Sequence, residues 1–208
     1  MMAIEDLGQL NEMHIDVLKE IGNIGAGNAA TSLAQMLNRE VDMKTPDVRI
    51  LEISEAYRAM GGPEMPVVAI LAKLYGDIDG IMMFVIQQDF TRSLLETLLG
   101  EGGSKCEQLS EMERSALAEI GNIMIGSYAA SIAALSGLTI KISVPAVASD
   151  MVGAVLTVPA TEMGSVSNKI VFIEDDFLSA NQTISADMML VPDIRSLNKL
   201  MNSLGIEL

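Results

Sequence analysis

Two short sets of polar residues recur with the same spacing in the two halves of the chain. Each set has an acid or a serine, a glutamate four residues later, and an asparagine three residues after that. This spacing puts all three side chains on one face of a helix. The apolar residues between them, such as Leu18 and Ile21, point elsewhere, toward a core. The sets are Asp16, Glu20 and Asn23 in the first half and Ser115, Glu119 and Asn122 in the second.

A glutamate and an asparagine, without a nucleophile or a set of metal ligands, can promote a reaction only by positioning other groups. A carboxamide does not titrate near neutrality, but it accepts one hydrogen bond and donates another, which suits holding a water molecule in a fixed orientation. Such positioning is sufficient for an activated substrate such as an acyl phosphate, because phosphoryl transfer has a loose transition state. Any Mg²⁺ would come with the phosphorylated partner. The alternative is an ordinary solvated helix face, and the recurrence of the set in one register argues against it.

The repeat extends well beyond these residues. Positions 10–48 align with 109–147 at one constant offset, the block EIGNI occurs in both, and Pro46 meets Pro145. A shared amphipathic pattern does not explain a shared proline at a fixed spacing. The sequence therefore predicts an internal duplication, with halves at about 10–100 and about 109–208 fused into a single domain of residues 1–208. We expect an approximate two-fold axis to relate the halves.

Two long helices must position the polar sets. Ser110 and Glu113 form a capping-box pattern that starts a helix near residue 111, and this helix runs to about Leu135. By the repeat, Asn11 caps the equivalent helix, from about 12 to Leu37. Apolar runs predict strands at 39–45, 48–53, 67–75, 80–87, 138–144, 170–175 and 186–191, and short amphipathic helices at 91–99 and 193–204. The predicted fold class is α+β, with two α/β halves, a β-sheet core and the two long helices exposed on one side.

The composition excludes several classes of function. Acidic residues outnumber basic ones 28 to 13, and the net charge of −15 repels nucleic acid and anionic membranes. The single cysteine, Cys106, and the single histidine, His14, exclude an internal disulfide and the usual zinc sites. We therefore expect no metal or other cofactor in the chain itself. No apolar run is long enough to span a bilayer and the N-terminus does not resemble a signal peptide, so a cytoplasmic location is expected.

The glycines after the first glutamate do not form a phosphate-binding loop. They lack the G-x-G-x-x-G spacing, follow a helix-forming run, and have no nearby G-K-[ST] lysine. Gly22 and Gly121 instead predict a close approach to the helix backbone, by a packed neighbour or by a docking partner.

The sequence resembles the CheC family of chemotaxis phosphatases, which act on the phosphorylated response regulator CheY. The family motif, [D/S]-x3-E-x2-N-x22-P, occurs twice and complete, and the resemblance covers essentially the whole chain. The related CheX carries one motif and dimerises, and FliY adds segments at both ends. Length and duplication therefore favour the CheC type, expected as a monomer. The two copies are Asp16, Glu20, Asn23 and Pro46, and Ser115, Glu119, Asn122 and Pro145.

The resemblance implies a role for each motif position. The asparagines would reach into the active site of CheY and orient the attacking water, and the glutamates would pair with its active-site lysine. Asp16 and Ser115, one turn back, would assist docking, and the two prolines would shape the strand after each helix. CheC proteins also bind the receptor deamidase CheD. The stretch after Pro145, including Asp150 and Met151, is a candidate contact for it.

Two other functions remain open from the sequence. The first is a non-catalytic or weakly catalytic adaptor that binds and regulates CheD. It differs from the phosphatase because CheD binding should survive the loss of Asn23 and Asn122. The second is a structural component of the flagellar switch, which the absence of a C-terminal switch domain disfavours.

Overall fold

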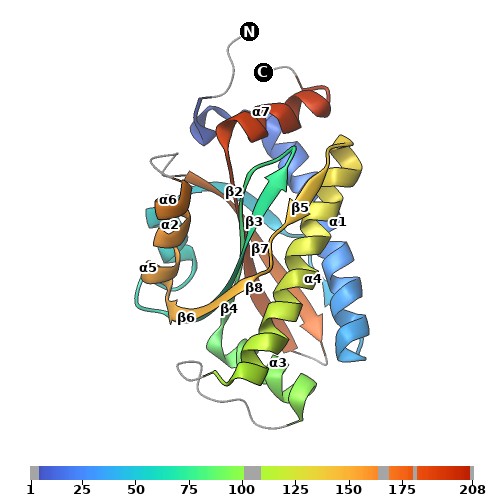
Figure 1. The fold of residues 1–208 in the computed structure, drawn as a ribbon, viewed down its shortest axis with the longest axis vertical. Coiled ribbons are helices and arrows are strands. Elements are labelled where there is room, and N and C mark those ends of the chain that lie inside the picture. Colours follow the sequence, from blue (N-terminus) through green and yellow to red (C-terminus); the bar gives the residue numbers. More distant parts are fainter. Residues whose placement is uncertain (1–4, 101–108, 164–168, 180–181, 207–208) are drawn as a thin grey trace.

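The computed structural model describes residues 5–100, 109–163, 169–179 and 182–206, and Cys106 lies outside these ranges. One antiparallel sheet of eight strands runs through the molecule, with helices on both of its faces (Figure 1). The helices are η1 Leu7–Gln9, α1 Glu12–Leu37, α2 Ile53–Ala59, α3 Gln88–Leu99, α4 Glu111–Ser136, α5 Val152–Val155, α6 Thr157–Met163 and α7 Ile194–Ser203. The strands are β1 Asp42–Met43, β2 Asp47–Glu52, β3 Pro66–Gly76, β4 Gly80–Gln87, β5 Ile140–Ile142, β6 Ala146–Met151, β7 Lys169–Ser179 and β8 Gln182–Pro192.

The two halves exchange strands across the sheet. Strands β4 and β8 pair at its centre, β1 and β2 of the first half pair with β7, and β5 and β6 of the second half pair with β3. The registers are equivalent: Asp47 lies opposite Glu174 in one outer pair, and Ala146 lies opposite Leu71 in the other. The predicted α+β class and two-fold relation are confirmed. The exchange means that each motif helix and its following strands pack on the hairpin of the other half.

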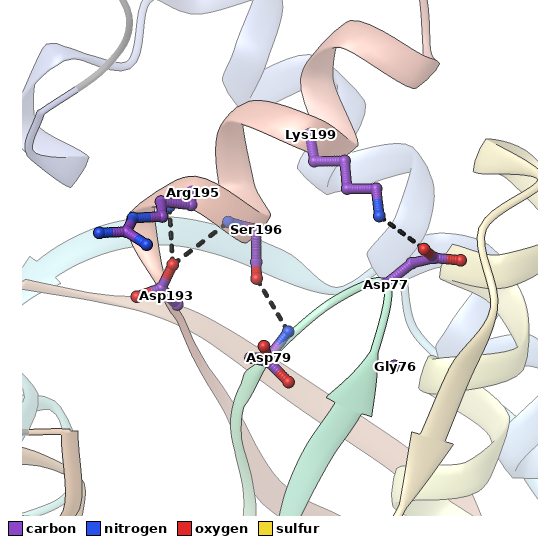
Figure 2. Close-up of a pocket in the computed structure, with 7 residues that line it drawn as sticks. All are labelled: Gly76, Asp77, Asp79, Asp193, Arg195, Ser196 and Lys199. Carbon is purple, nitrogen blue, oxygen red and sulfur yellow. Dashed lines mark hydrogen bonds and ion pairs between the residues drawn. The ribbon is translucent and has the colours of Figure 1, made fainter.

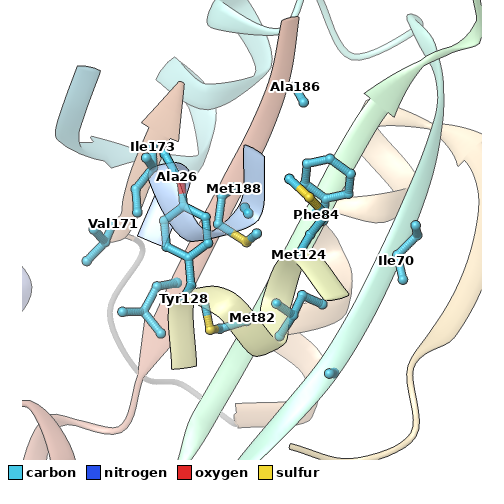
Figure 3. Close-up of a cluster of buried hydrophobic side chains, with 14 of the residues drawn as sticks. Ala26, Ile70, Met82, Phe84, Met124, Tyr128, Val171, Ile173, Ala186 and Met188 are labelled. Carbon is cyan, nitrogen blue, oxygen red and sulfur yellow. The ribbon is translucent and has the colours of Figure 1, made fainter. Parts of the chain in front are cut away.

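The long helices α1 and α4 lie side by side over one face of the sheet (Figure 1). They cross where Gly25 meets the Tyr128 ring, since a Cβ at Gly25 would lie 2.5 Å from Cδ1 of Tyr128. Next to this crossing, Asn28 Nδ2 donates a hydrogen bond to Ser131 Oγ at 3.3 Å. Beneath the helices, Tyr128 lies among buried side chains from β4, β7 and β8 (Figure 3). The core thus holds both motif helices in place.

A second, smaller apolar cluster lies on the other face of the sheet, under α2 and α5. It includes Met83, Phe172 and Met189 from the strands and Ala56 and Val152 from those helices. The sequence did not predict α2, α5, α6 or β6. Strand β6 is rich in Ala, Ser and Asp, which have low β-propensity, and it forms because six of its residues pair with β3.

Helix α4 is long and apolar enough, by length and composition, to cross a membrane, but half of its most apolar window is buried inside the fold. Its packing against β3, β4, β5 and α1 accounts for this character. In the described part of the chain, α4 is therefore a helix of the buried core that packs on one face of the sheet.

Candidate functional site

Both motif helices begin with capping boxes, which fix the residue at which each helix starts. Asn11 Oδ1 accepts a hydrogen bond from the His14 backbone N–H at 3.2 Å, and the Asn11 N–H donates to His14 Nδ1 at 3.1 Å. In α4 the predicted pair does the same, with Ser110 Oγ accepting from the Glu113 N–H and Glu113 Oε2 accepting from the Ser110 N–H. Burial lowers the pKa of His14, which keeps the imidazole neutral so that Nδ1 can accept. The lone histidine is therefore a structural capping residue.

The motif glutamates and asparagines lie on the outer sides of these helices. Glu20, Glu119 and Asn122 are exposed, whereas Asn23 is half-buried. Within the described residues, these four side chains make no hydrogen bond or ion pair. Their amide and carboxylate groups are therefore available to an external molecule.

The prolines and glycines of the motif region bring the strands against the helices. A Cβ at Gly22 would lie 2.9 Å from Val48 Cγ2 and 3.8 Å from Pro46 Cγ, so Pro46 packs on α1 one residue before Asn23. In the second half, a Cβ at Gly121 would overlap Ile70 of β3. Of the two explanations that the sequence left open for these glycines, the structure identifies packed neighbours within the chain.

In the second half, the motif residues gather around one groove. The groove has a volume of about 320 Å³ and lies between α4 and the β5–β6 connection. Within it, Val144 is 89% exposed beside the half-buried Pro145, and the sequence did not predict a role for Val144. Its lining residues are Ser115, Ala118, Glu119, Asn122, Ile142, Ser143, Val144 and Pro145. The structure therefore brings all four predicted motif residues of this half together.

In the first half, the same positions have different surroundings. Asp16 forms an exposed ion pair with Lys19, with 3.2 Å between Oδ1 and Nζ. Pro46 is buried, and Thr45 is exposed at the position equivalent to Val144. The helix face is thus preserved in both halves, but the first is flanked by more polar groups.

A larger polar hollow of about 530 Å³ lies elsewhere, between the β3–β4 turn and the start of α7 (Figure 2). Asp193 Oδ1 accepts from the Arg195 and Ser196 N–H groups, and Lys199 Nζ pairs with Asp77 Oδ1. This pairing, with the Thr139 N–H, lowers the pKa of Asp77. Asp77 and Lys199 pair with each other, Asp193 caps the start of α7, and none of the predicted motif residues lines this hollow. We therefore take the motif groove as the candidate site.

Asp150 and Met151 lie apart from the groove. Both are exposed at the far end of β6, and Asp150 is five residues beyond Pro145, roughly 16 Å along an extended strand. Among residues 5–100, 109–163, 169–179 and 182–206, no three His, Cys, Asp or Glu side chains gather in a way that could hold a metal ion.

Comparison with known proteins identifies the family. The model of the CheC-like family matches residues 13–50 and 112–149, the two segments that contain the motif copies. The CheY-P phosphatase CheC of Bacillus subtilis is 36% identical over 203 residues, covering 96% of this chain and 97% of that protein. The chain belongs to the CheC family. The flagellar motor switch phosphatase FliY of B. subtilis is 34% identical over 148 residues, which are 69% of this chain and 38% of FliY.

Solved structures share the CheC fold. The FliY structure from Thermotoga maritima matches with a TM-score of 0.76 at 24% identity, covering 95% of this chain and 98% of that one. A chain of the CheX–CheY–BeF3–Mg²⁺ complex from Borrelia burgdorferi matches with a TM-score of 0.53 at 19% identity, covering 81% of this chain and 95% of that one. At these identities the likeness concerns the fold alone.

Proposed function

We propose that this CheC-family protein hydrolyses the aspartyl phosphate of the response regulator CheY at two sites, one on each long helix. The observation that carries the proposal is the pair of unpartnered Glu and Asn side chains that recurs on α1 and α4. The B. subtilis relative, similar over nearly its whole length, is named a CheY-P phosphatase, which supports the same substrate.

Each asparagine acts as a positioning group for water. Its amide accepts a hydrogen bond from the water and fixes the oxygen in line with the aspartyl–phosphorus bond. The water oxygen attacks phosphorus, the bond to the aspartyl oxygen breaks, and the carboxylate leaves as an anion. The water proton passes to the phosphate, so no general base is needed early. Mg²⁺ held by CheY would neutralise charge on the phosphoryl oxygens, and we expect this chain to supply no metal of its own.

Each glutamate sets the register of the helix on the partner. Glu20 and Glu119 lie one turn before the asparagines and are free to pair with the active-site lysine of CheY. Such a charge-assisted contact strengthens when the interface excludes water. Asp16 and Ser115, one turn further back, assist docking at the rim. Pro46 and Pro145 shape the connections that border the helices and need not touch the substrate.

The test is the decay of radiolabelled CheY phosphate with catalytic amounts of the protein. Wild-type protein should accelerate the decay, and the variant Asn23→Ala/Asn122→Ala should lose at least about a hundredfold and fall to the spontaneous rate. Both side chains lie at or near the surface, so the double variant should fold normally, which circular dichroism checks. Full activity in the well-folded double variant would refute the proposed chemistry.

A second function, binding and regulation of the deamidase CheD, is favoured by one observation. Asp150 and Met151 present an exposed carboxylate and a 52% exposed apolar side chain at the end of β6 away from the groove. We therefore propose that CheD binds there independently of the asparagines. Asp150→Lys should abolish binding of CheD in a pull-down, and Asn23→Ala/Asn122→Ala should leave it intact. The reverse pattern would overturn this assignment.

We further propose that residues 1–208 act as a single cytoplasmic unit and as a monomer. The strand exchange supports this proposal, because the outer strands of each half pair with a strand of the other half. One chain also presents both motif helices. Light scattering should give a mass near 22.2 kDa, and a stable dimer at working concentration would contradict the proposal.

A further inference from the structure

Two large apolar side chains are exposed at equivalent positions of the motif helices. Met13 of α1 is 62% exposed and Met112 of α4 is 68% exposed. Each is the second residue of its helix, and each follows the capping residue by two positions. A single exposed apolar residue needs no explanation, but the same one at the same place in both copies does.

Both methionines extend the motif face by a further turn. Met13 precedes Asp16 by three residues and Glu20 by seven, and Met112 precedes Ser115 and Glu119 in the same way. At 100° per residue these positions lie within one narrow stripe of the helix. With a rise of 1.5 Å per residue, each methionine lies about 10 Å from its glutamate along the axis. That distance is within the span of one protein–protein footprint.

We propose that Met13 and Met112 each insert into an apolar recess of CheY beside its phosphorylation site and thereby set the affinity of the complex. This inference rests on the proposed function. Methionine suits the task because its unbranched, polarisable side chain adapts to an irregular recess. Val144, 89% exposed at the edge of the second groove, adds apolar contact there. Since the methionines lie ten residues, or nearly three turns, from the asparagines, they bind the substrate protein without touching the reacting atoms.

The test separates binding from turnover. Met13→Ala/Met112→Ala should raise the KM for CheY phosphate about tenfold, because burial of a methionine side chain is lost at each site. The kcat should stay within about twofold, since the water-positioning groups are unchanged. Met13→Leu/Met112→Leu should restore KM to within about threefold of the wild-type value. Leu135→Ala, which removes an exposed apolar side chain at the opposite end of α4, should leave both constants unchanged.

Direct binding keeps this inference distinguishable from the proposed function. Titration of each variant with CheY loaded with BeF3 and Mg²⁺ measures affinity without hydrolysis. A wild-type protein that hydrolyses CheY phosphate but whose alanine variant has the same KM and affinity would overturn the role of the methionines alone. A wild-type protein that binds in a methionine-dependent way without accelerating decay would support this inference and overturn the phosphatase. A fall in kcat with unchanged KM and affinity would also overturn the proposed role.

Discussion

Asn23 and Asn122 occupy equivalent positions on α1 and α4, yet Asn23 is half-buried, whereas Asn122 is exposed and lines a groove. The groups around the two asparagines also leave the second copy more accessible. Asp16 is engaged by Lys19 in the first copy, while its equivalent Ser115 faces the groove of the second. Both copies have kept the groups proposed to act on the substrate, but the groups of the second copy are more accessible to a partner. We therefore expect the second copy to be the faster site.

The two helices also differ in how they are anchored. Tyr128 of α4 donates a hydrogen bond to Asp175 Oδ2 of β7 at 2.5 Å, entirely within the core. The equivalent positions in the first half are Ala29 and Ala72, as the matching strand registers show. Only the second motif helix is thus tied to the sheet by this polar pair.

Charge reversal at the glutamates should give the largest effect. Glu119→Lys in the Asn23→Ala background tests the second copy alone, and Glu20→Lys in the Asn122→Ala background tests the first. Each should reduce kcat/KM for CheY phosphate more than about tenfold, because an attractive contact with a lysine becomes a repulsive one. Glu96→Lys, an equal change of charge on the exposed side of α3, should have little effect. An equal loss with Glu96→Lys would mean that net charge alone governs the encounter.

Alanine at the equivalent glycines should destabilise the two halves unequally. At Gly121 the added Cβ meets both Cγ2 and Cβ of Ile70, whereas at Gly22 its close contact is Val48 Cγ2. Gly121→Ala should therefore cost about 2–3 kcal/mol of unfolding free energy, and Gly22→Ala about 1 kcal/mol. Urea unfolding monitored by circular dichroism measures both.

A matched control lies one turn beyond Asn122. At Gly126 a new Cβ would lie 3.7 Å from Ile142 Cδ1, an ordinary contact. Gly126→Ala should therefore leave stability unchanged or raise it by up to about 1 kcal/mol through helix propensity. If Gly121→Ala were as stable as Gly126→Ala, the close packing of α4 on β3 would be wrong.

The buried pair under α4 should make stability depend on pH. Burial raises the pKa of Asp175 to about 7, above its value of 3.8 in the unfolded chain. The folded state therefore holds the proton more tightly, and this contribution to stability is lost as the pH rises toward 7. Burial also raises the pKa of Asp187 to about 7, whereas burial lowers that of His14, which acts in the opposite sense.

Comparison with Asp175→Asn isolates the effect of the one carboxyl, because His14 and Asp187 are common to both proteins. The variant should gain stability relative to wild type between pH 5 and pH 8, since it cannot ionise. Urea midpoints at the two pH values measure the difference. A constant difference between the two proteins would contradict a raised pKa at Asp175.

Removal of Lys19 should have the smallest effect. The Lys19–Asp16 pair is exposed on both sides, and such pairs contribute little free energy. Lys19→Ala, measured in the Asn122→Ala background, should change the activity of the first copy by less than about twofold. A larger gain would show that the ion pair, and not the partial burial of Asn23, limits that site.

Much of the fold followed from local sequence signals. The capping patterns at Asn11 and Ser110 and the length of the apolar pattern place the long helices within a residue of their observed bounds. Strand β6 was missed because its residues have little intrinsic preference for a strand and acquire the structure by pairing with β3. The strand exchange was also beyond the sequence, because a repeat does not tell which hairpin each helix covers.

The candidate site was predicted in part. The motif residues are found on the expected helix faces, and their spacing was sufficient to group them. The sequence did not predict that Ile142 and Val144 would line the groove, because the path of the β5–β6 connection depends on tertiary packing. Nor did it predict the partial burial of Asn23, since the two copies are alike in sequence at this point.

The most direct test is the decay of CheY phosphate with four proteins: wild type, Asn23→Ala, Asn122→Ala and the double variant. Both single variants should remain active, Asn23→Ala more so than Asn122→Ala, and the double variant should match the spontaneous rate. Accelerated decay with the folded double variant would contradict the central claim that the two asparagines position the attacking water.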